Sequence, residues 1–303
     1  MTGMTEVNWI GVDWGTSNLR AWGMGADNTV VAEARSDAGM GTLPPEGFEA
    51  ALIDLVGGWL GAGAMDVVVC GMAGSRQGWA EAPYRAVPCA AKTDTLTQVQ
   101  TSDPRLRVHI VPGVKQAQPA DVMRGEETQI AGFLALNPKW DGVICLPGTH
   151  TKWALVSAEE IVSFQSFMTG EMFALLAKQS ILRHTVAADG WDSGAFDEAL
   201  DDSLANPARL AARLFSLRAE ALLAELDGVT ARSRLSGALI GVELAAARPY
   251  WLGQQVAVIG ADALSDAYVA ALSRQGVQVV QLDVDAMTRA GLAAAHENVG
   301  AVT

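Results

Sequence analysis

Hydrophobic and polar positions near the N-terminus predict a strand, a tight turn and a second strand. Residues 9–13 form an apolar run that ends on the carboxylate of Asp13, and residues 19–24 form a second run. A third run follows at residues 29–35. Apolar runs bounded by glycine and small polar residues are typical of strands joined in hairpins. The segment therefore predicts a three-strand meander.

The same pattern recurs in the middle of the chain. Residues 143–157 contain an apolar run, a Gly-Thr turn and an alternating strand, and residues 161–167 add a further strand. Aligning the two Gly-Thr pairs places Leu146 where the first copy has Asp13. A duplicated meander with one acid predicts two domains that face one ligand.

Helical periodicity and buried strands alternate along the rest of the chain, which predicts an α/β fold. A helical spacing at residues 48–60 precedes an apolar run at residues 66–71. Residues 80–106 contain three prolines and are expected to form a loop. Further strands are predicted at 107–111, 255–260 and 277–282, and further helices from residues 125 and 169 and within 194–247, 261–272 and 285–297.

Composition and charge exclude several classes of partner. The chain has 303 residues, 50% of them hydrophobic, which is enough for two domains with large cores. The net charge of −13 argues against nucleic acid, because neutralising phosphates requires clustered Lys and Arg. No run approaches the roughly 20 apolar residues of a membrane span, and the N-terminal residues lack a secretory signal. With three isolated cysteines and no metal-ligand spacing of histidines, we expect a cytoplasmic protein with reduced thiols and no membrane partner.

The turn of the first hairpin carries residues suited to phosphate. Gly15, Thr16, Ser17 and Asn18 can direct backbone N–H groups at an anion. A carboxylate at Asp13 does not favour a bare phosphate, so its natural partner is a cation, most simply Mg²⁺ carried by a nucleotide. The segment therefore predicts a site for a nucleoside phosphate with its metal.

The second turn offers a matching set. Gly148, Thr149, His150 and Thr151 occupy the corresponding positions. His150 and Lys152 could stabilise phosphate charge, although Lys152 could equally point to solvent from its strand.

Residues 71–79 follow a buried strand and offer a site for an anionic substrate. Open α/β sheets place ligands beyond the carboxyl ends of their strands. Arg76 can make a bidentate contact to a carboxylate, with Gln77 and Trp79 beside it. An ordinary loop with a solvated arginine explains the same residues. Lys92 is a further cation that could face the ligand.

Residues 121–136 begin a helix with two carboxylates in its first turn. The helix dipole favours carboxylates there, which is a purely structural explanation. The catalytic alternative is that Glu126 or Glu127 accepts the proton of a substrate hydroxyl. Arg124, two residues before Glu126, is a second candidate partner for a substrate carboxylate.

A glycine at the end of the strand 255–260, Gly260, opens a helix and suits an adenosine pocket, although a plain strand-to-helix turn explains it as well. The sequence contains neither a G-x-x-x-x-G-K-[ST] loop nor a complete G-x-G-x-x-G after a strand, and it lacks the protein-kinase motifs. These absences weigh against three common nucleotide-binding folds.

Five stretches together resemble the 2-dehydro-3-deoxygalactonokinase family, within the sugar kinase, heat-shock protein 70 and actin superfamily. They are VDWGTSNLRAW, GMAGSRQGW, VMRGEETQIAG, LPGTHTKW and FMTGE, in this order. The resemblance implies a two-lobed ribonuclease H-like (actin-like ATPase) fold, with duplicated mixed sheets flanked by helices. We expect an N-terminal lobe at 1–118 with the sugar-acid site, a C-terminal lobe at 119–284 with the adenosine site, and a terminal helix within 285–303 that returns to the first lobe.

The family resemblance also implies an activity. It is the transfer of the γ-phosphate of ATP, with Mg²⁺, to the 6-hydroxyl of 2-dehydro-3-deoxy-D-galactonate in galactonate catabolism. Many sugar kinases touch the sugar with a Gly-x-x-x-Gln-Arg element, similar to the stretch around Arg76. Glycerol-kinase-like relatives have a Gly-Asp-Gln-Gln helix start that supplies the catalytic Asp, and Gly125-Glu126 stands in that place with Glu for Asp. We therefore favour Glu126 over Glu127 as the general base.

Two alternative functions stay open. The enzyme could phosphorylate another keto-deoxy sugar acid or a hexose. From a different class, the chain could be an actin-like or chaperone-like ATP-binding switch whose output is lobe motion. The short chain lacks a peptide-binding extension, which disfavours that alternative. A homo-oligomer is a possible assembly.

Overall fold

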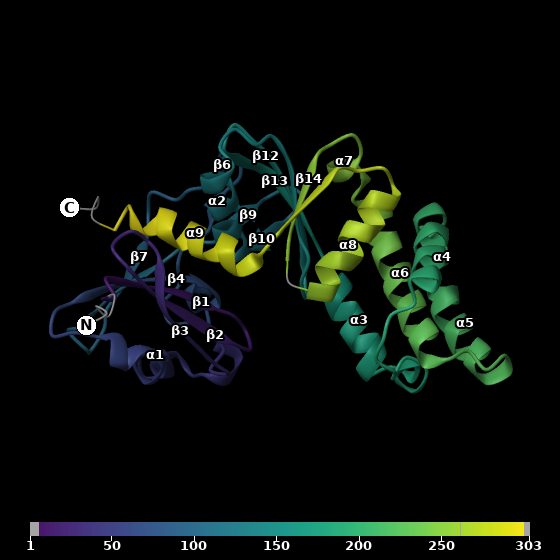
Figure 1. Ribbon diagram of the computed structural model, residues 1–303, viewed down its shortest axis with the longest axis horizontal. Coiled ribbons are helices and arrows are strands. Elements are labelled where there is room, and N and C mark those ends of the chain that lie inside the picture. The colour runs from purple at the N-terminus through teal and green to yellow at the C-terminus, as the bar shows by residue number, and fades with distance from the viewer. Residues whose placement is uncertain (1–5, 261, 300–303) are drawn as a thin grey trace, which may run out of the picture. The chain divides into compact units, whose positions relative to one another are not determined.

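The structure is a computed structural model that describes residues 6–260 and 262–299 (Figure 1). Ala261, the first residue of a predicted helix, lies outside the described residues, as do the outermost residues of the predicted segments 1–118 and 285–303.

The chain folds into two compact units. The first holds the described residues up to Asp141, the segment Val156–Ser163 and the residues from Asp283 onward. The second holds Gly142–Leu155 and the described part of Phe164–Leu282. The lobe boundary expected after residue 118 falls inside the first unit, and the terminal helix groups with that unit.

Strand β1 (Trp9–Trp14) lies in the interior of the six-stranded sheet of the first unit. It pairs antiparallel with β2 (Leu19–Met24) and parallel with β4 (Met65–Gly71). The register places Asp13 opposite Arg20. The strand order is β3-β2-β1-β4-β8-β7, with β3 at Val30–Ser36, β8 at Leu106–Ile110 and β7 at Thr97–Val99.

Helices cover both faces of this sheet. Side chains alternate between the faces along each strand, so apolar residues at successive positions contact different helices. Helix α1 (Phe48–Val56) packs Phe48, Leu52 and Val56 against the side chains of Ile10, Val12 and Trp14. Helix α9 (Val284–His296) packs Leu292 and Ala295 with Trp9, Trp22 and Val68. The interior strands are therefore buried on both faces.

Helix α2 (Glu126–Leu136) crosses α9 through two glycines. A Cβ atom on Gly132 would overlap the carbonyl oxygen of Met287, and one on Gly291 would overlap the carbonyl oxygen of Thr128. The two backbones can approach this closely only because neither glycine has a side chain. The first turn of α2 is thus fixed against the C-terminal helix.

The loop predicted at residues 80–106 is wrong in part. It contains β5 (Arg85–Ala86), β6 (Cys89–Ala90) and β7. Strands of two or three residues are too short to show a periodic pattern. Strand β5 joins β9 (Val114–Gln116) and β10 (Asp121–Met123) in a small sheet of order β10-β9-β5.

The second six-stranded sheet repeats the arrangement of the first. Its order is β15-β14-β11-β12-β13-β6, with β11 at Gly142–Leu146, β12 at Thr151–Ser157, β13 at Glu160–Phe167, β14 at Val256–Ile259 and β15 at Val279–Leu282. The pairs β11–β14 and β14–β15 are parallel, like β1–β4 and β4–β8. The predicted duplication is confirmed, and so is the predicted α/β class with mixed sheets flanked by helices.

The second unit contains most of the helices. They are α3 (Thr169–Lys178), α4 (Ser193–Ala205), α5 (Leu210–Leu223), α6 (Gly228–Ala246), α7 (Arg248–Trp251) and α8 (Asp262–Arg274). A buried polar chain ties β12 to α6 and α8. The Tyr268 hydroxyl donates to Glu243 at 2.8 Å and lies 2.9 Å from the Thr151 hydroxyl, and the Trp153 indole donates to Glu243 at 2.8 Å.

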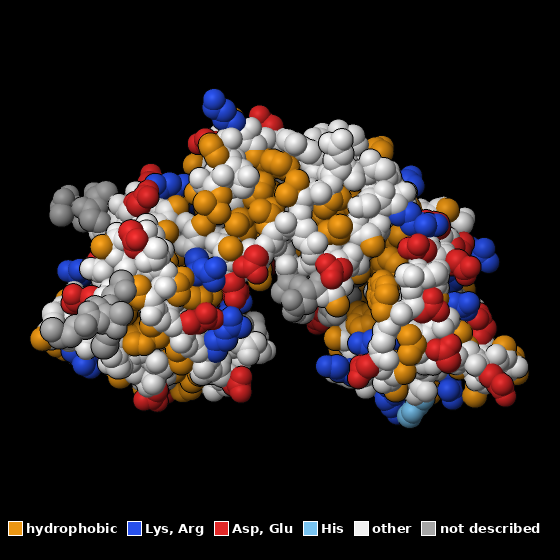
Figure 2. Space-filling model, viewed as in Figure 1, with side chains coloured by type: hydrophobic (Ala, Val, Ile, Leu, Met, Phe, Trp, Pro, Cys, Tyr) orange, Lys and Arg blue, Asp and Glu red, His pale blue; other side chains and the backbone are white. Residues whose placement is uncertain are grey.

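The surface of the described residues carries side chains of both charges. Figure 2 shows Lys and Arg side chains scattered among Asp and Glu on the visible face, rather than gathered into a basic stripe. Within residues 6–260 and 262–299, no helix combines the length and the apolar character needed to cross a bilayer.

Candidate active site

The first turn is held tightly and leaves its small side chains exposed. The Gly15 amide donates to the Asn18 carbonyl at 2.9 Å, and the Gly41 amide donates to the Thr16 carbonyl at 2.8 Å. A Cβ at Gly39 would overlap the backbone of Ser17, so a second loop packs directly against the turn. Thr16, Ser17 and Asn18 are exposed. Such a rigid turn with reachable polar groups is suited to binding an anion.

Asp13 lies at the end of β1, next to the exit of β4. It forms an ion pair with Arg20, and the Cys70 thiol lies 3.8 Å from its other oxygen. Burial raises the pKa of Asp13, and the Arg20 guanidinium offsets part of this rise. In the described residues no three His, Cys, Asp or Glu side chains gather as a metal site. A single carboxylate nevertheless fits Mg²⁺ that arrives with phosphate and water ligands.

The start of α2 lies beside the same strand end. Gly125 has φ of 108°, a conformation that favours glycine, and an added Cβ would lie 3.6 Å from the Cα of Gly71. The Gly125 amide donates to Glu127 at 2.7 Å, and the Arg124 amide donates to Glu126 at 3.1 Å. Both acids therefore accept hydrogen bonds from backbone N–H groups that directly precede the helix.

The two glutamates differ in burial. Glu127 is 0% exposed, and burial, followed by the charge of Glu126, raises its pKa to about 7. Glu126 is half-buried and can meet a ligand from solvent. The structure therefore gives Glu127 a capping position and leaves Glu126 accessible.

Arg124, directly before the N-terminal cap of α2, contacts the loop that contains Ala82 and Tyr84. Its Nη2 donates to the Ala82 carbonyl at 2.8 Å, and its guanidinium lies 4.3 Å from the centroid of the Tyr84 ring. Among the described residues, its Nε and Nη1 atoms are buried without a hydrogen-bond acceptor. Buried N–H groups of this kind usually have a partner, so this edge of the guanidinium is an incomplete anion-binding group.

The other predicted substrate residues have contacts of their own. Arg76 and Gln77 are exposed, and Arg76 lies 3.6 Å from Glu81. The ring of Trp79 packs against Trp14 and Phe48, with centroids 5.9 and 6.2 Å away, so Trp79 contributes to the core. Lys92 pairs with Glu297 beyond the end of α9 at 2.6 Å. Their predicted roles toward a substrate stay predictions.

The second turn is fixed by the start of α3. A Cβ at Gly170 would overlap the Gly148 carbonyl, and the Glu171 amide donates to the Thr149 carbonyl at 2.9 Å. His150 Nε2 lies 2.6 Å from Glu171, and the buried Lys152 ammonium donates to the His150 carbonyl at 3.1 Å. Thr149 and His150 are exposed, whereas Thr151 is buried in its bond to Tyr268. The predicted phosphate residues are thus split between reachable groups and groups that hold the turn.

A cavity of about 960 Å³ adjoins this second turn. Its walls include Gly148, Thr149, Gly170, Phe173, Trp191 and Arg232, together with residues from the first turns of α8. Arg232 lies 5.0 Å from the ring centroid of Phe173, and Trp191 is 50% exposed. Gly260 lies just before α8, where an added Cβ would overlap the Ser265 hydroxyl. The cavity is large enough for a nucleoside.

Sequence reasoning missed the aromatic walls of this cavity and the partner of Asp13. Phe173 and Trp191 come from separate segments with no motif that joins them. Arg20 could have been found, because a four-residue turn at 15–18 places it opposite Asp13 in a hairpin.

Comparisons with known proteins show the family of the chain. The family model for 2-keto-3-deoxy-galactonokinase matches residues 13–295. A probable 2-dehydro-3-deoxygalactonokinase of Rhizobium meliloti is 40% identical over 290 residues, covering 94% of this chain and 95% of the relative. The 2-dehydro-3-deoxygalactonokinase of Escherichia coli is 33% identical over 289 residues, covering 94% and 96%.

Solved structures extend the comparison to the fold. A crystal structure from Sinorhizobium meliloti, described as a presumed 2-dehydro-3-deoxygalactonokinase, has a TM-score of 0.89 at 38% identity and covers 97% of this chain and 98% of that one. Component A of (R)-2-hydroxyglutaryl-CoA dehydratase from Acidaminococcus fermentans has a TM-score of 0.54 at 13% identity over 96% and 98%, which shows a shared fold alone. Since the family model spans nearly the whole chain and both curated relatives exceed 30% identity, the chain belongs to the 2-keto-3-deoxy-galactonokinase family.

Proposed function

We propose that this protein transfers the γ-phosphate of ATP to the 6-hydroxyl of 2-dehydro-3-deoxy-D-galactonate. Membership of the family supports the reaction and its substrate class. The observation that carries the proposal is the close approach of Gly71 and Gly125, which brings the carboxylate at the end of β1 and the glutamates at the start of α2 to one edge of a sheet. Ligands of open α/β sheets bind at such edges.

Phosphoryl transfer requires positioning and charge neutralisation more than covalent chemistry. Asp13 would hold Mg²⁺, which when bound would neutralise charge on the nucleotide phosphates. The turns at 15–18 and 148–151 would donate backbone N–H groups to phosphate oxygens, and His150 and Lys152 would stabilise phosphate charge. The cavity beside the second turn would hold the nucleoside, with Trp191 and Phe173 as apolar walls.

Glu126 would accept the proton of the sugar-acid hydroxyl. Its side chain reaches solvent, whereas the carboxyl of Glu127 is enclosed and bonded to the Gly125 amide. A general base must come within hydrogen-bond reach of the proton it removes, which favours the accessible residue. Proton transfer by such a base contributes about 10²- to 10⁴-fold to the rate.

The substrate carboxylate would be held by arginine. Arg124 is the leading candidate, because its Nε and Nη1 groups lack an acceptor among the described residues. Tyr84 would have to move for a ligand to reach them, since it covers the guanidinium. Arg76, with Gln77, and Lys92 are further candidates on exposed segments.

The test is a coupled assay of ADP release with Mg-ATP. It compares 2-dehydro-3-deoxy-D-galactonate with its gluconate epimer and with neutral hexoses. Strong preference for the galactonate compound is expected, and equal or greater turnover of another sugar acid would move the assignment to that substrate. ADP release with none of them would refute the kinase assignment.

Variants of the catalytic turn separate the kinase from a nucleotide switch. Glu126→Gln should lose about 10²-fold or more in kcat and keep nucleotide binding. Glu127→Gln is the matched control in the same turn and should retain more activity. Greater loss in Glu127→Gln would exchange the two roles.

A further inference from the structure

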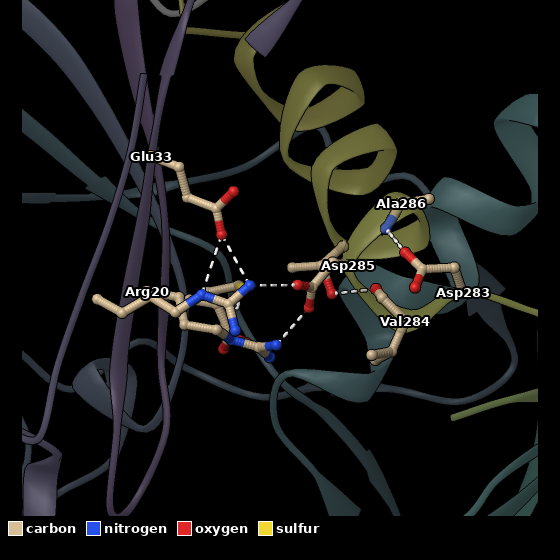
Figure 3. A network of polar contacts seen from close by, with 10 residues as sticks. Arg20, Glu33, Asp283, Val284, Asp285 and Ala286 are labelled. Atoms are coloured by element: carbon tan, nitrogen blue, oxygen red, sulfur yellow. Dashed lines mark hydrogen bonds and ion pairs between the residues drawn. The ribbon is translucent and has the colours of Figure 1, made fainter. Parts of the chain in front are cut away.

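Helix α9 is joined by ion pairs to the hairpin that carries Asp13. Arg20, on β2, pairs with Asp13 and also with Asp285 in the first turn of α9. Figure 3 shows the side chains of Arg20 and Asp285 pointing toward one another from these two elements. The second oxygen of Asp285 accepts a hydrogen bond from Arg35 Nη2 at 3.0 Å. One carboxylate of the C-terminal helix therefore shares an arginine with the acid proposed to hold the metal.

The central charges of this network are shielded from solvent. The side chains of Arg20, Asp13 and Asp285 are 24%, 14% and 18% exposed. Charges this close and partly buried are screened less by salt than surface charges. With Arg35 and Glu33, which lie 2.7 Å apart, the five side chains carry a single net negative charge. Loss of the Asp285 charge would make the network neutral.

The start of α9 is held so that Asp285 cannot easily withdraw. Asp283 caps the helix by accepting a hydrogen bond from the Ala286 amide at 2.7 Å, also drawn in Figure 3. Gly291, two turns later, lies against the backbone of α2. The contact of Asp285 with Arg20 is therefore fixed by the helix itself and not only by side-chain rotamers.

We propose that Asp285 is a positioning residue that sets the affinity of the first hairpin for Mg²⁺. By sharing Arg20, it prevents this arginine from neutralising Asp13 completely, and its own charge adds to the negative potential at the metal. This inference rests on the proposed function, in which Asp13 binds Mg²⁺ that accompanies the nucleotide.

The experiment measures the gain in ADP affinity that Mg²⁺ provides. ADP is titrated calorimetrically into the full-length protein with and without Mg²⁺, and the ratio of the two dissociation constants is compared between variants. Asp285→Asn should reduce the Mg²⁺-dependent gain about tenfold, the order expected for one charge acting on a divalent ion in a partly solvated site. The Mg²⁺ concentration for half-maximal kinase rate should rise by a similar factor, with kcat at saturating Mg²⁺ changed less than about threefold.

Two variants serve as controls. Asp283→Asn removes the same charge from the same helix start, retains a good capping residue and has no ion pair with Arg20 among the described contacts. Its Mg²⁺-dependent gain should match that of the natural protein. Asp285→Glu restores the carboxylate and should recover most of the loss.

The outcomes separate this inference from the proposed function. An equal gain in Asp285→Asn and Asp283→Asn would overturn the inference, as would loss of kcat alone without a shift in Mg²⁺ dependence. If Asp13→Asn retained the full Mg²⁺-dependent gain, the inference would fall while the kinase assignment stood. If no sugar acid gave turnover, the kinase assignment would fall, and calorimetry would still decide the role of Asp285.

Discussion

The buried carboxyl of Glu127 makes the free energy of unfolding depend on pH. Its carboxyl is 0% exposed, accepts the Gly125 amide at 2.7 Å and lies 3.2 Å from the Thr128 hydroxyl. The perturbation is Glu127→Gln, which preserves shape and can still accept from Gly125. One N–H of its amide can donate to the Thr128 hydroxyl.

The magnitude follows from the pKa of Glu127, which burial raises from 4.5 to about 7. The folded protein holds this proton more tightly than the unfolded chain. Between these two pH values the folded state therefore binds more protons, and the free energy of unfolding falls as the pH rises. At 1.36 kcal/mol per pKa unit, the natural protein loses roughly 3 kcal/mol across this window. The variant has no carboxyl at this position and does not lose this free energy of unfolding.

The assay is urea unfolding of both proteins between pH 4 and 8.5, followed by the fluorescence of the nine tryptophans. The difference between the free energies of unfolding of the two proteins cancels the contributions of the other titrating groups. Relative to the natural protein, the variant should gain roughly 3 kcal/mol in free energy of unfolding as the pH rises. Glu126→Gln removes the neighbouring charge that also raises the pKa of Glu127, and shows how much of the slope depends on that charge and not on burial. A flat difference for Glu127→Gln, or the same slope for both variants, would refute the burial argument.

Three further predictions concern packing and ligand binding. Gly132→Ala should lower the free energy of unfolding by about 2 kcal/mol or more, because its Cβ would overlap the Met287 carbonyl oxygen. Gly58→Ala, with open space around the new Cβ, should not, and thermal unfolding of both variants checks this. Trp191→Ala should raise the KM for ATP several-fold and leave the KM for the sugar acid unchanged, because this side chain lines the cavity in the second unit. Steady-state kinetics with each substrate varied in turn checks this. Arg124→Lys should raise the KM for the sugar acid by about 10-fold or more, because lysine cannot make the bidentate contact, and an unchanged KM would remove Arg124 from the substrate site.

Much of the fold could be predicted because its signals are local. The hairpins at 9–24 and 143–157 show apolar runs and glycine turns within about fifteen residues, and their repetition indicated the duplicated sheets. The short strands between residues 85 and 99 have no such signal, because their pairing is decided by β9, β8 and β13, which lie elsewhere in the chain. Tertiary pairing overrides local pattern in such segments.

The candidate site was predictable only where its residues share a motif. Asp13 and Glu126 each lie in a compact motif, and the structure places these motifs near one another through Gly71 and Gly125. Trp79 lies in the same predicted segment as Arg76, yet its ring packs into the core. Nothing in the sequence indicates which side chain of such a segment turns inward. Asp285 pairs with Arg20 across most of the chain, a contact that no spacing rule could reveal.

The roles that we propose for the two adjacent acids of α2 differ because packing buries one and leaves the other accessible. Gly125 can adopt its φ of 108° without strain, and this conformation directs its amide to the Glu127 carboxyl, which is then enclosed. This enclosure is the reason that we propose Glu126 and not Glu127 as the base. Glu126 accepts a 3.1 Å bond from the Arg124 amide and is half-buried, and in the proposed mechanism it accepts the proton of the substrate hydroxyl. The close α2–α9 crossing at Gly132 and Gly291 holds this turn in place, so the role that we propose for Glu126 depends on the packing of these two helices.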